Sequence, residues 1–330
     1  MGHENSMESG SQGYSLPNWH GPYLRFKNTL NSGAIFLLLA VGVATFDWLQ
    51  EGRYPQHFFS WLGLAIVILG VPHGALDVVY AKSTFKLVRV RDWIYFFAVY
   101  LICAGATIVF WKFAPSLFFG LFLLLSVAHF STDIDSSEPL WVRGFYGGSI
   151  VVLPFLLHAQ ETARIFAFFM PVTHVDHLRI LLEPLSAAWF SGALAAAIYL
   201  LYRRALSAFV ILGLILLFIF VPPLVAFTTY FCFLHSPRHI GRALKIDIGL
   251  STGQLIRMAS LPTFFAIVLF ILLGWGGIEL QSSERRQVTT VFVGLAALTV
   301  PHMILLYFKE RISGTRGTRY RRGNQLSPKA

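Results

Sequence analysis

Histidine is the residue type whose placement in this chain most directly suggests chemistry. Eleven histidines are present, and five of them lie at matching ends of four long apolar segments. They are His73 in VPHGALD, His129 in AHFSTD, His235 and His239 in LHSPRH, and His302 in VPHMIL. Neutral imidazole is the commonest protein ligand of transition metals, and ionisable side chains inside membranes usually mark function. The sequence therefore predicts a metal site near one membrane face.

The pair His235 and His239 has the spacing of a chelating motif. Residues four apart on a helix project from the same face, so both rings can reach one ion. Pro237 lies between them, and a proline inside a helix removes a backbone hydrogen bond and clashes with the preceding turn. We therefore expect a helix to begin or restart near Pro237, or the span to break there into a loop.

Two of the histidine motifs also carry an aspartate four residues later. Asp77 follows His73, and Asp133 follows His129. On a helix, each carboxylate would lie one turn along the same face, where it can accept the second ring N–H and fix the tautomer of a metal ligand. We expect this orienting role for Asp77. For Asp133, close to the end of its apolar segment, helix capping or contact with cytoplasmic water is an equal alternative.

The remaining histidines have less specific settings. His302 is open to two interpretations, a metal ligand or a hydrogen-bond partner between helices. We expect structural or solvated roles for four histidines at the opposite face or in an external loop: His57, His158, His174 and His177. His3 and His20 fall in the polar N-terminal tail. The predicted metal ligands are His73, His129, His235 and His239.

Long apolar segments must position these histidines. The chain is 55% hydrophobic and only 13% charged, whereas a soluble domain has about 25% charged residues. A helix of about 20 apolar residues spans a bilayer. The pattern predicts an all-α, polytopic transmembrane helix bundle of roughly ten spans, or eight to nine if the shortest do not cross. The predicted spans are 34–49, 58–81, 93–111, 116–130, 141–157, 185–202, 205–221, 224–234, 261–275 and 288–307.

The net charge of +10 is distributed as in a membrane protein. Most basic residues lie between apolar runs, and they fall on one side of the membrane if both termini are cytoplasmic. This favours a multi-pass protein of the inner (plasma) membrane over a nucleic-acid-binding protein. We expect three regions: a disordered N-terminal tail (1–32), a transmembrane helical domain with the histidine site (33–308) and a basic cytoplasmic tail (309–330).

Four motifs together resemble a known family: PHGALD, AHF followed by an aspartate, HSPRH, and PH in the last span. Their order and spacing resemble those of the Brp/Blh family of membrane β-carotene 15,15'-dioxygenases. The resemblance runs from the second predicted span to the tenth and so covers most of the chain. Ser131 departs from the family pattern, which often has glycine after AHF.

The resemblance implies a non-haem Fe(II) centre that uses O2 as co-substrate to cleave the central double bond of β-carotene into two retinals. Carried over by motif, the implied iron ligands are His73, His129, His235 and His239. His302 also belongs to a family motif, as a near-site residue or an alternative ligand. The carotenoid substrate would enter from the lipid phase, and the retinal product would pass to a rhodopsin.

A carotenoid requires a long apolar slot that places one bond beside the metal. An all-histidine shell suits such a slot, because it adds no negative charge and can leave coordination positions open. Aromatic residues near the predicted ligands are candidates for the lining, with ordinary packing as the alternative. They are Trp61, Phe130, Phe227, Tyr230, Phe231 and Phe233.

Other functions are compatible with part of this pattern. A membrane lipid hydrolase could hold zinc and an activated water with His73, Asp77, His235 and His239. Paired histidines could hold one haem in an electron carrier, and histidine with aspartate could carry protons in a transporter. A diiron desaturase is disfavoured, because the chain contains a single HxxxH box. Metal analysis and a Soret band distinguish these functions from carotenoid cleavage.

Overall fold

The computed structural model describes residues 20–51, 53–55, 58–246, 251–275 and 283–325, and every regular element within them is helical, which confirms the all-α prediction. Two elements are π-helical (η1 and η3) and one is a 3₁₀ turn (η2). In chain order the elements are α1 (His20–Gln50), α2 (Phe58–Ala65), η1 (Ile66–Gly70), α3 (Pro72–Ala75), α4 (Asp77–Phe85), α5 (Val90–Phe113), α6 (Pro115–Phe130), η2 (Ser131–Asp133), α7 (Leu140–Leu157), α8 (Ala159–Phe166), α9 (Val172–Tyr202), α10 (Ser207–Phe220), α11 (Pro223–Tyr230), η3 (Phe231–His235), α12 (Ser236–Ala243), α13 (Thr252–Trp275) and α14 (Ser283–Gln325).

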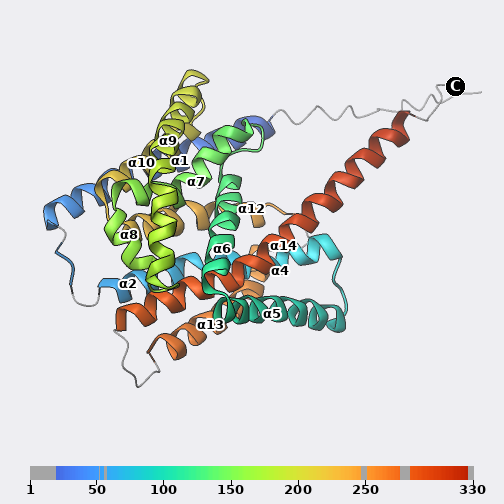
Figure 1. Ribbon diagram of the computed structural model, residues 1–330. Coiled ribbons are helices and arrows are strands. Elements are labelled where there is room, and N and C mark those ends of the chain that lie inside the picture. Colours follow the sequence, from blue (N-terminus) through green and yellow to red (C-terminus); the bar gives the residue numbers. More distant parts are fainter. Residues whose placement is uncertain (1–19, 52, 56–57, 247–250, 276–282, 326–330) are drawn as a thin grey trace, which may run out of the picture.

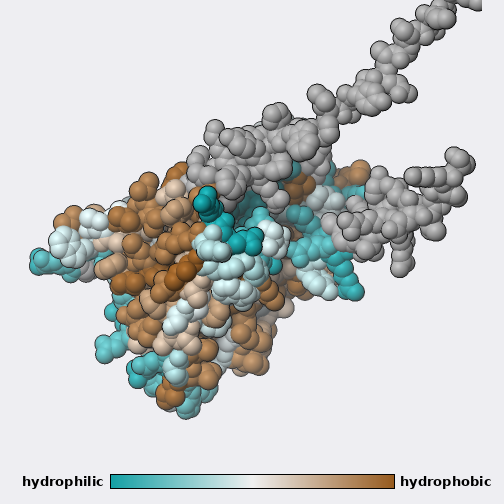
Figure 2. Space-filling model, turned by 90° about the horizontal axis from the view of Figure 1, so that it is seen from above, coloured by the Kyte–Doolittle hydropathy of each residue, from teal (hydrophilic) through white to brown (hydrophobic). Residues whose placement is uncertain are grey.

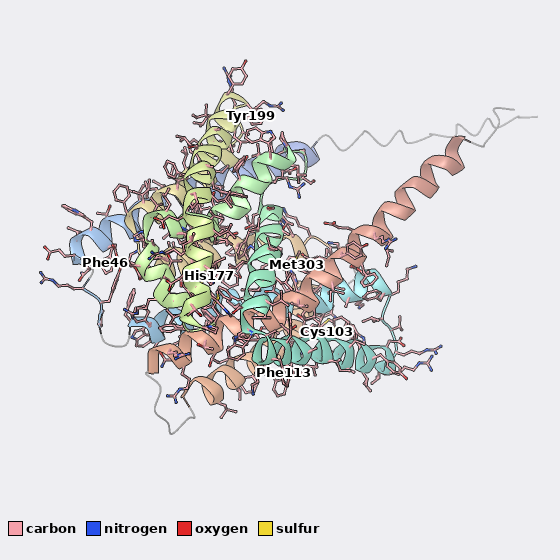
Figure 3. All side chains as sticks on the ribbon, in the orientation of Figure 1. Phe46, Cys103, Phe113, His177, Tyr199 and Met303 are labelled. Carbon is pink, nitrogen blue, oxygen red and sulfur yellow. The ribbon has the colours of Figure 1, made fainter. Side chains whose placement is uncertain are left out.

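The described part of the chain has the surface of a membrane protein. Hydrophobic residues cover much of the face seen in Figure 2. Large apolar side chains project from the periphery, including Phe46 on α1 (Figure 3), which is 57% exposed, and Phe113 at the end of α5, which is 86% exposed. Six described helical stretches are long and apolar enough to cross a bilayer: Ser32–Gln50, Val90–Phe113, Pro115–Asp133, Leu140–Leu157, Val172–Tyr202 and Arg285–Ile312.

Two of the predicted spans are interrupted. Span 58–81 is divided into α2, η1, α3 and α4, and span 224–234 is divided into α11 and η3, which α12 follows directly. The expected restart near Pro237 is confirmed: this proline lies in the first turn of α12, where its missing N–H costs nothing. Both interruptions lie beside histidine motifs, so they belong to the construction of the site.

Several helices extend past the boundaries expected from hydropathy. α1 begins at His20, so residues 20–32 of the predicted disordered tail are helical, and α14 continues to Gln325 through most of the predicted basic tail. α9 takes in the predicted external loop, because Val175 on its first turns is buried against a hydrophobic cluster. The short helix α8 was not predicted. The count of ten crossings stays a prediction.

The core forms where α7, α9 and α10 pack together, with α1 against α10. Small residues of α9 make this packing close: Ala193, Ala196 and Ala197 are fully buried, and small side chains let helix backbones approach each other. Gly147 has the same effect where α7 meets the end of α6. A Cβ at this position would collide with the carbonyl of Val127 and with Ser131.

The last helix crosses the rest of the bundle. α14 packs against α2, α4, α5 and α13, and Figure 1 shows α5 and α13 running beside it. This position brings the middle of α14, which carries His302, next to segments from the first half of the chain. A helix at the end of the sequence thereby completes a site begun by α4 and α6.

Candidate metal centre

His129 lies near the end of α6, where the helix tightens into η2. Ser131 Oγ donates to the Val127 carbonyl at 2.7 Å, and Thr132 Oγ1 donates to the His129 carbonyl at 2.7 Å. Ser131 has φ −55° and ψ −22°, which are right-handed helical values open to any residue. The departure from glycine at this position therefore leaves the local backbone unstrained. The turn buries Asp133 close to the end of α6.

The π-helical segments η1 and η3 lie against each other beside the site. A π-helical turn inserts one extra residue and so reorients the side chains that follow, and such turns are frequent at functional sites. η3 ends on His235, and η1 ends just before the PHGALD motif. Ser236 Oγ joins the two segments by donating to the Leu69 carbonyl at 2.7 Å.

Close approach of η1 and η3 requires a glycine at position 70. A Cβ on Gly70 would overlap the ring of Phe231. That ring stacks on His235, with ring centroids 5.4 Å apart and an interplanar angle of 18°. The packing at Gly70 therefore fixes the aromatic ring that lies on a predicted metal ligand.

Four described histidine rings form one buried cluster. His129, His235 and His239 each place a ligand nitrogen within 4.8 Å of the others, and their residues are 3%, 0% and 3% exposed. The ring of His302 lies at the edge, with its centroid 5.3 Å from that of His129 and 5.8 Å from that of His239. Segments far apart in the sequence thus converge at one point.

Hydrogen bonding assigns the tautomer of His235. Its Nδ1 lies 2.9 Å from Oδ2 of Asp133, and an ionised carboxylate only accepts, so Nδ1 carries the proton and Nε2 the lone pair. This Nε2 lies 3.1 Å from Nε2 of His129. Two nitrogens in neighbouring positions around one metal ion, each about 2.1 Å from it, are about 3 Å apart. The residues present therefore fit one transition-metal ion.

Asp133 contacts several side chains besides His235. Its Oδ2 accepts a hydrogen bond from the Tyr230 hydroxyl at 2.6 Å. Its Oδ1 lies 3.6 Å from Nε2 of His239 and 3.8 Å from Nη2 of Arg242. The carboxylate is fully buried. Two histidines of the cluster are thus held beside a single negative charge.

A second carboxylate bonds the histidine at the edge of the cluster. His302 Nδ1 lies 2.5 Å from Oδ1 of Asp77, so its proton is also on Nδ1 and its lone pair on Nε2. The Tyr100 hydroxyl donates to Oδ2 of Asp77 at 2.8 Å and lies 3.3 Å from the Leu298 carbonyl. His302 therefore has the tautomer of a ligand and a hydrogen bond between helices at the same time.

The described histidine partner of Asp133 is not the one that the spacing indicated. We expected either an orienting contact with His129, four residues earlier, or a capping or solvated role. Asp133 instead bonds His235 on η3. The chain leaves the α-helix after Phe130 and tightens into η2, so four-residue spacing no longer places the two side chains on one face.

The same reason applies to Asp77. Leu76 separates α3 from α4, and the described histidine partner of Asp77 is His302 on α14. The side chain of His73 lies outside the described residues. Its backbone is in α3, which packs against α12 and α14, the elements that carry His239 and His302.

Two arginines of α12 hold this helix against the end of α6. Arg238 donates to the Asp133 carbonyl at 3.1 Å, and Arg242 donates to the Thr132 carbonyl at 2.9 Å. The last carbonyls of a helix lack intrahelical partners and carry negative partial charge, so cations stabilise them. These bonds keep His239 beside His129.

An apolar cavity of about 920 Å³, its open mouth included, adjoins the cluster, with His129 in its wall. The three hydroxyl residues of the wall each donate to a backbone carbonyl: Ser126 to Phe122 O, Thr162 to Pro154 O and Thr299 to Leu295 O. Their protons are therefore satisfied within the protein. The wall suits a hydrocarbon, because it is lined mostly by apolar and aromatic side chains, as small-molecule sites usually are.

The structure separates the predicted lining residues into three groups. Phe130, Phe227 and Phe231 line the cavity. Tyr230 is fully buried behind them and bonds Asp133, whereas Trp61 and Phe233 are 64% and 52% exposed on the outer surface. Nearness in sequence to a ligand was a poor guide here, because neighbouring residues of a helix point to different sides.

Sequence reasoning missed most of the cavity wall, although a signal was present. On α6 the wall includes Phe119, Phe122, Ser126 and His129, beside Leu123 and Phe130. On α14 three wall residues lead to the histidine: Phe292, Leu295 and Thr299, followed by His302. Both sets have the spacing three, four, three, which marks one face of a helix. Wall residues can therefore be predicted by following the helix face of each histidine toward the start of its helix, in steps of three or four residues.

The described histidines that we expected to be structural or solvated lie away from the cluster. His158 Nε2 is 2.9 Å from a backbone carbonyl of α10, and His174 Nδ1 is 2.6 Å from a serine hydroxyl of α6. His177 is exposed on α9 (Figure 3). His3 and His57 lie outside the described residues. These positions agree with the roles expected for the described members of the group.

Comparison with known proteins bears on the identity of this site. Residues 64–309 match the family model described as β-carotene 15,15'-dioxygenase. The chain belongs to this family. The β-carotene 15,15'-dioxygenase of an uncultured marine bacterium is 32% identical over 265 residues, which cover 76% of this chain and 93% of that relative. The probable β-carotene 15,15'-dioxygenase Blh of Halobacterium salinarum is 26% identical over 298 residues, covering 79% and 86% respectively. No solved structure matches the chain.

The part of the chain that matches the β-carotene 15,15'-dioxygenase family contains the whole site. All five histidine positions of the predicted motifs fall within residues 64–309, as do Asp77 and Asp133 and every residue of the cavity wall. Helix α1, which packs on α10, precedes the matched region. The resemblance stated from the motifs is confirmed.

Proposed function

We propose that this chain cleaves the central double bond of β-carotene with O2 to give two retinals, at a non-haem iron held by histidines. The observation that carries the proposal is a buried histidine cluster in the wall of an apolar, aromatic-lined cavity, in a member of the β-carotene 15,15'-dioxygenase family. Cleavage of one C=C bond by one O2 accounts for both carbonyl oxygens of the products.

The proposed iron ligands are His129, His235 and His239, with His73 as the fourth and His302 as a near-site residue or alternative ligand. Asp133 would orient His235 through Nδ1, and such a hydrogen bond makes the opposite nitrogen a better ligand. Iron with open coordination positions would supply the activation of O2. An all-histidine set brings no negative charge into direct contact with the ion, and it can leave positions open for O2.

The cavity would orient the substrate. Its wall offers a polyene aromatic and aliphatic contacts and few polar groups, so binding removes apolar surface from water or lipid without leaving polar groups unsatisfied. Exclusion of water from the cluster would also protect the reacting centre from side reactions. The residues of the chain thus bind and align the substrate, and the metal centre performs the oxidation.

The test is retinal formation by purified protein loaded with Fe(II) and supplied with β-carotene in detergent. We expect retinal from the wild type and from His177→Ala, an exposed histidine of α9, but none from His129→Ala or His235→Ala. Metal analysis of the same samples should give one iron per chain, lost in the two cluster variants. Stoichiometric zinc with esterase or amidase activity and no retinal would overturn the proposal in favour of a lipid hydrolase.

We further propose that the protein lies in the inner (plasma) membrane with roughly ten crossings (eight to ten) and both termini cytoplasmic. The distribution of positive charge between apolar segments supports this orientation. In it the carotenoid enters from the lipid phase, and retinal returns to the membrane or to a rhodopsin. Reporter fusions at the two ends test the topology: both should be active in the cytoplasm, and an external signal from either end would refute it.

A further inference from the structure

The cavity wall includes a group of four phenylalanines, which we call the aromatic box: Phe119, Phe166, Phe169 and Phe292. Phe119 stacks on Phe169, with centroids 5.1 Å apart at 9°, and meets Phe166 edge to face at 4.6 Å. Phe292 closes the group at 5.6 Å from Phe169. Residues of α6, α8, α14 and the turn before α9 therefore form a single aromatic surface in the cavity wall.

The aromatic box lies at a fixed distance from the histidine cluster along two independent helices. Phe119 and His129 are ten residues apart on α6, and Phe292 and His302 are ten residues apart on α14. At 1.5 Å per residue, ten residues of helix span about 15 Å. This length is comparable to one half of a carotenoid, from the central double bond to the outer edge of the terminal ring.

The wall between the aromatic box and the histidine cluster is suited to a polyene chain. Phe122 and Ser126 lie between Phe119 and His129 on one face of α6, and both line the cavity. The Ser126 hydroxyl donates to its own helix at 2.8 Å. The stretch offers contacts along a straight hydrocarbon chain and no charged side chain among the residues of the described wall.

We propose that the aromatic box is the seat of the terminal ring and sets the position of cleavage. This inference rests on the proposed function and adds its specificity. When the terminal ring lies against the box, the double bond one half-molecule away lies beside the histidines. The position of cleavage is then set by the distance from the ring and not by the midpoint of the substrate. Aromatic faces give a cyclic hydrocarbon extensive apolar contact, with a geometry that a flexible aliphatic wall lacks.

A first test uses the unaltered protein and a substrate shortened at one end. β-Apo-8'-carotenal keeps one terminal ring but has its midpoint at a different bond from β-carotene. If the protein measures from the ring, it releases retinal from this substrate, as it does from β-carotene. Products cut at the midpoint of the shortened chain would overturn the inference, and they would leave the proposed function intact.

A second test alters the aromatic box and compares two neighbouring residues. Phe118 and Phe119 are 4% and 3% exposed on the same helix, but Phe118 lies outside the cavity wall and packs edge to face on Phe110 at 6.0 Å. With Phe119→Leu we expect the ratio of off-centre apocarotenals to retinal to rise about tenfold, the low end of the effect of a changed pocket wall. Phe118→Leu should keep the wild-type ratio.

Phe292→Leu alters the aromatic box from a different helix, α14, and should raise the ratio of off-centre apocarotenals to retinal in the same way. Iron content and gel-filtration profile of each variant establish that it is folded and loaded. An unchanged product ratio in both Phe119→Leu and Phe292→Leu, or an equal change in Phe118→Leu, would refute the aromatic box as the stop. Absence of retinal from the iron-loaded wild type would instead refute the proposed function itself.

Discussion

Two buried aspartates in this protein make the same kind of contact with different consequences. Asp133 and Asp77 each accept a hydrogen bond from Nδ1 of a clustered histidine and another from a tyrosine hydroxyl. In both cases the tautomer directs the lone pair of the other ring nitrogen away from the carboxylate. We call each aspartate with its histidine and tyrosine a unit. Each unit joins helices that are distant in sequence, so its contacts depend on the tertiary structure.

The difference lies in what surrounds the two carboxylates. Asp133 also lies 3.6 Å from His239 and 3.8 Å from Arg242, so it touches two members of the histidine triad and a cation. Asp77 occupies the first turn of α4, where the helix dipole favours a negative charge, and its histidine stands at the edge of the cluster. Asp133 therefore organises the centre of the site, and Asp77 orients one ring beside it.

The largest effect that this comparison predicts follows from Asp133→Asn. The variant keeps the volume of the side chain and removes the charge shared by His235 and His239. Loss of such a hydrogen-bonded partner costs metal sites about 10–100-fold, and we expect the upper end here, in both iron affinity and retinal rate. Competition with a chelator measures the affinity. Wild-type affinity would show that Asp133 is merely a packing residue.

Asp77→Asn should have a smaller effect of the same kind. Because its partner His302 lies at the edge of the cluster, we expect about a tenfold loss of iron affinity, the low end of the range for such partners. His302→Gln, measured in parallel, should match it if the carboxylate acts through this histidine. An effect as large as that of Asp133→Asn would remove the distinction between the two units and make His302 a full ligand.

Tyr230→Phe tests how strongly the central unit is held. The hydroxyl of Tyr230 is completely buried and bonds the carboxylate at 2.6 Å, and a hydrogen bond to a charged group contributes about 1.5–3 kcal/mol. We expect the midpoint of thermal unfolding in detergent to fall, with iron still bound at saturating concentration. An unchanged midpoint would indicate that another donor replaces the hydroxyl.

Tyr100→Phe is the matched and smallest change. Tyr100 is only partly buried on the outer helix α5 and divides its hydroxyl between two acceptors. A longer, less buried hydrogen bond whose donor is shared contributes less than the bond of Tyr230, so the shift in unfolding midpoint should be below that of Tyr230→Phe. The same unfolding measurement checks it, and a larger shift than that of Tyr230→Phe would reverse the ranking of the two units.

The sequence predicted the long apolar helices because their signal is local. A run such as 93–111 has to be a helix in lipid, since its backbone can satisfy its hydrogen bonds in no other open form, and the structure places α5 there. The start of α9 was missed because its first turns are polar and are held by Val175, whose burial depends on other helices. The interruptions at Gly70 and His235 likewise depend on how η1 meets η3.

The sequence by itself determined which residues are the candidates for the chemistry: histidines and aspartates are costly inside an apolar bundle, so their presence at one level predicted a site. Only the tertiary structure decided how they are paired. Asp133 bonds His235 and Asp77 bonds His302, because helices break within the motifs and helix ends that are distant in sequence meet there. Spacing along the chain reports which residues share a face, but a hydrogen bond depends on distance in space, which packing alone sets.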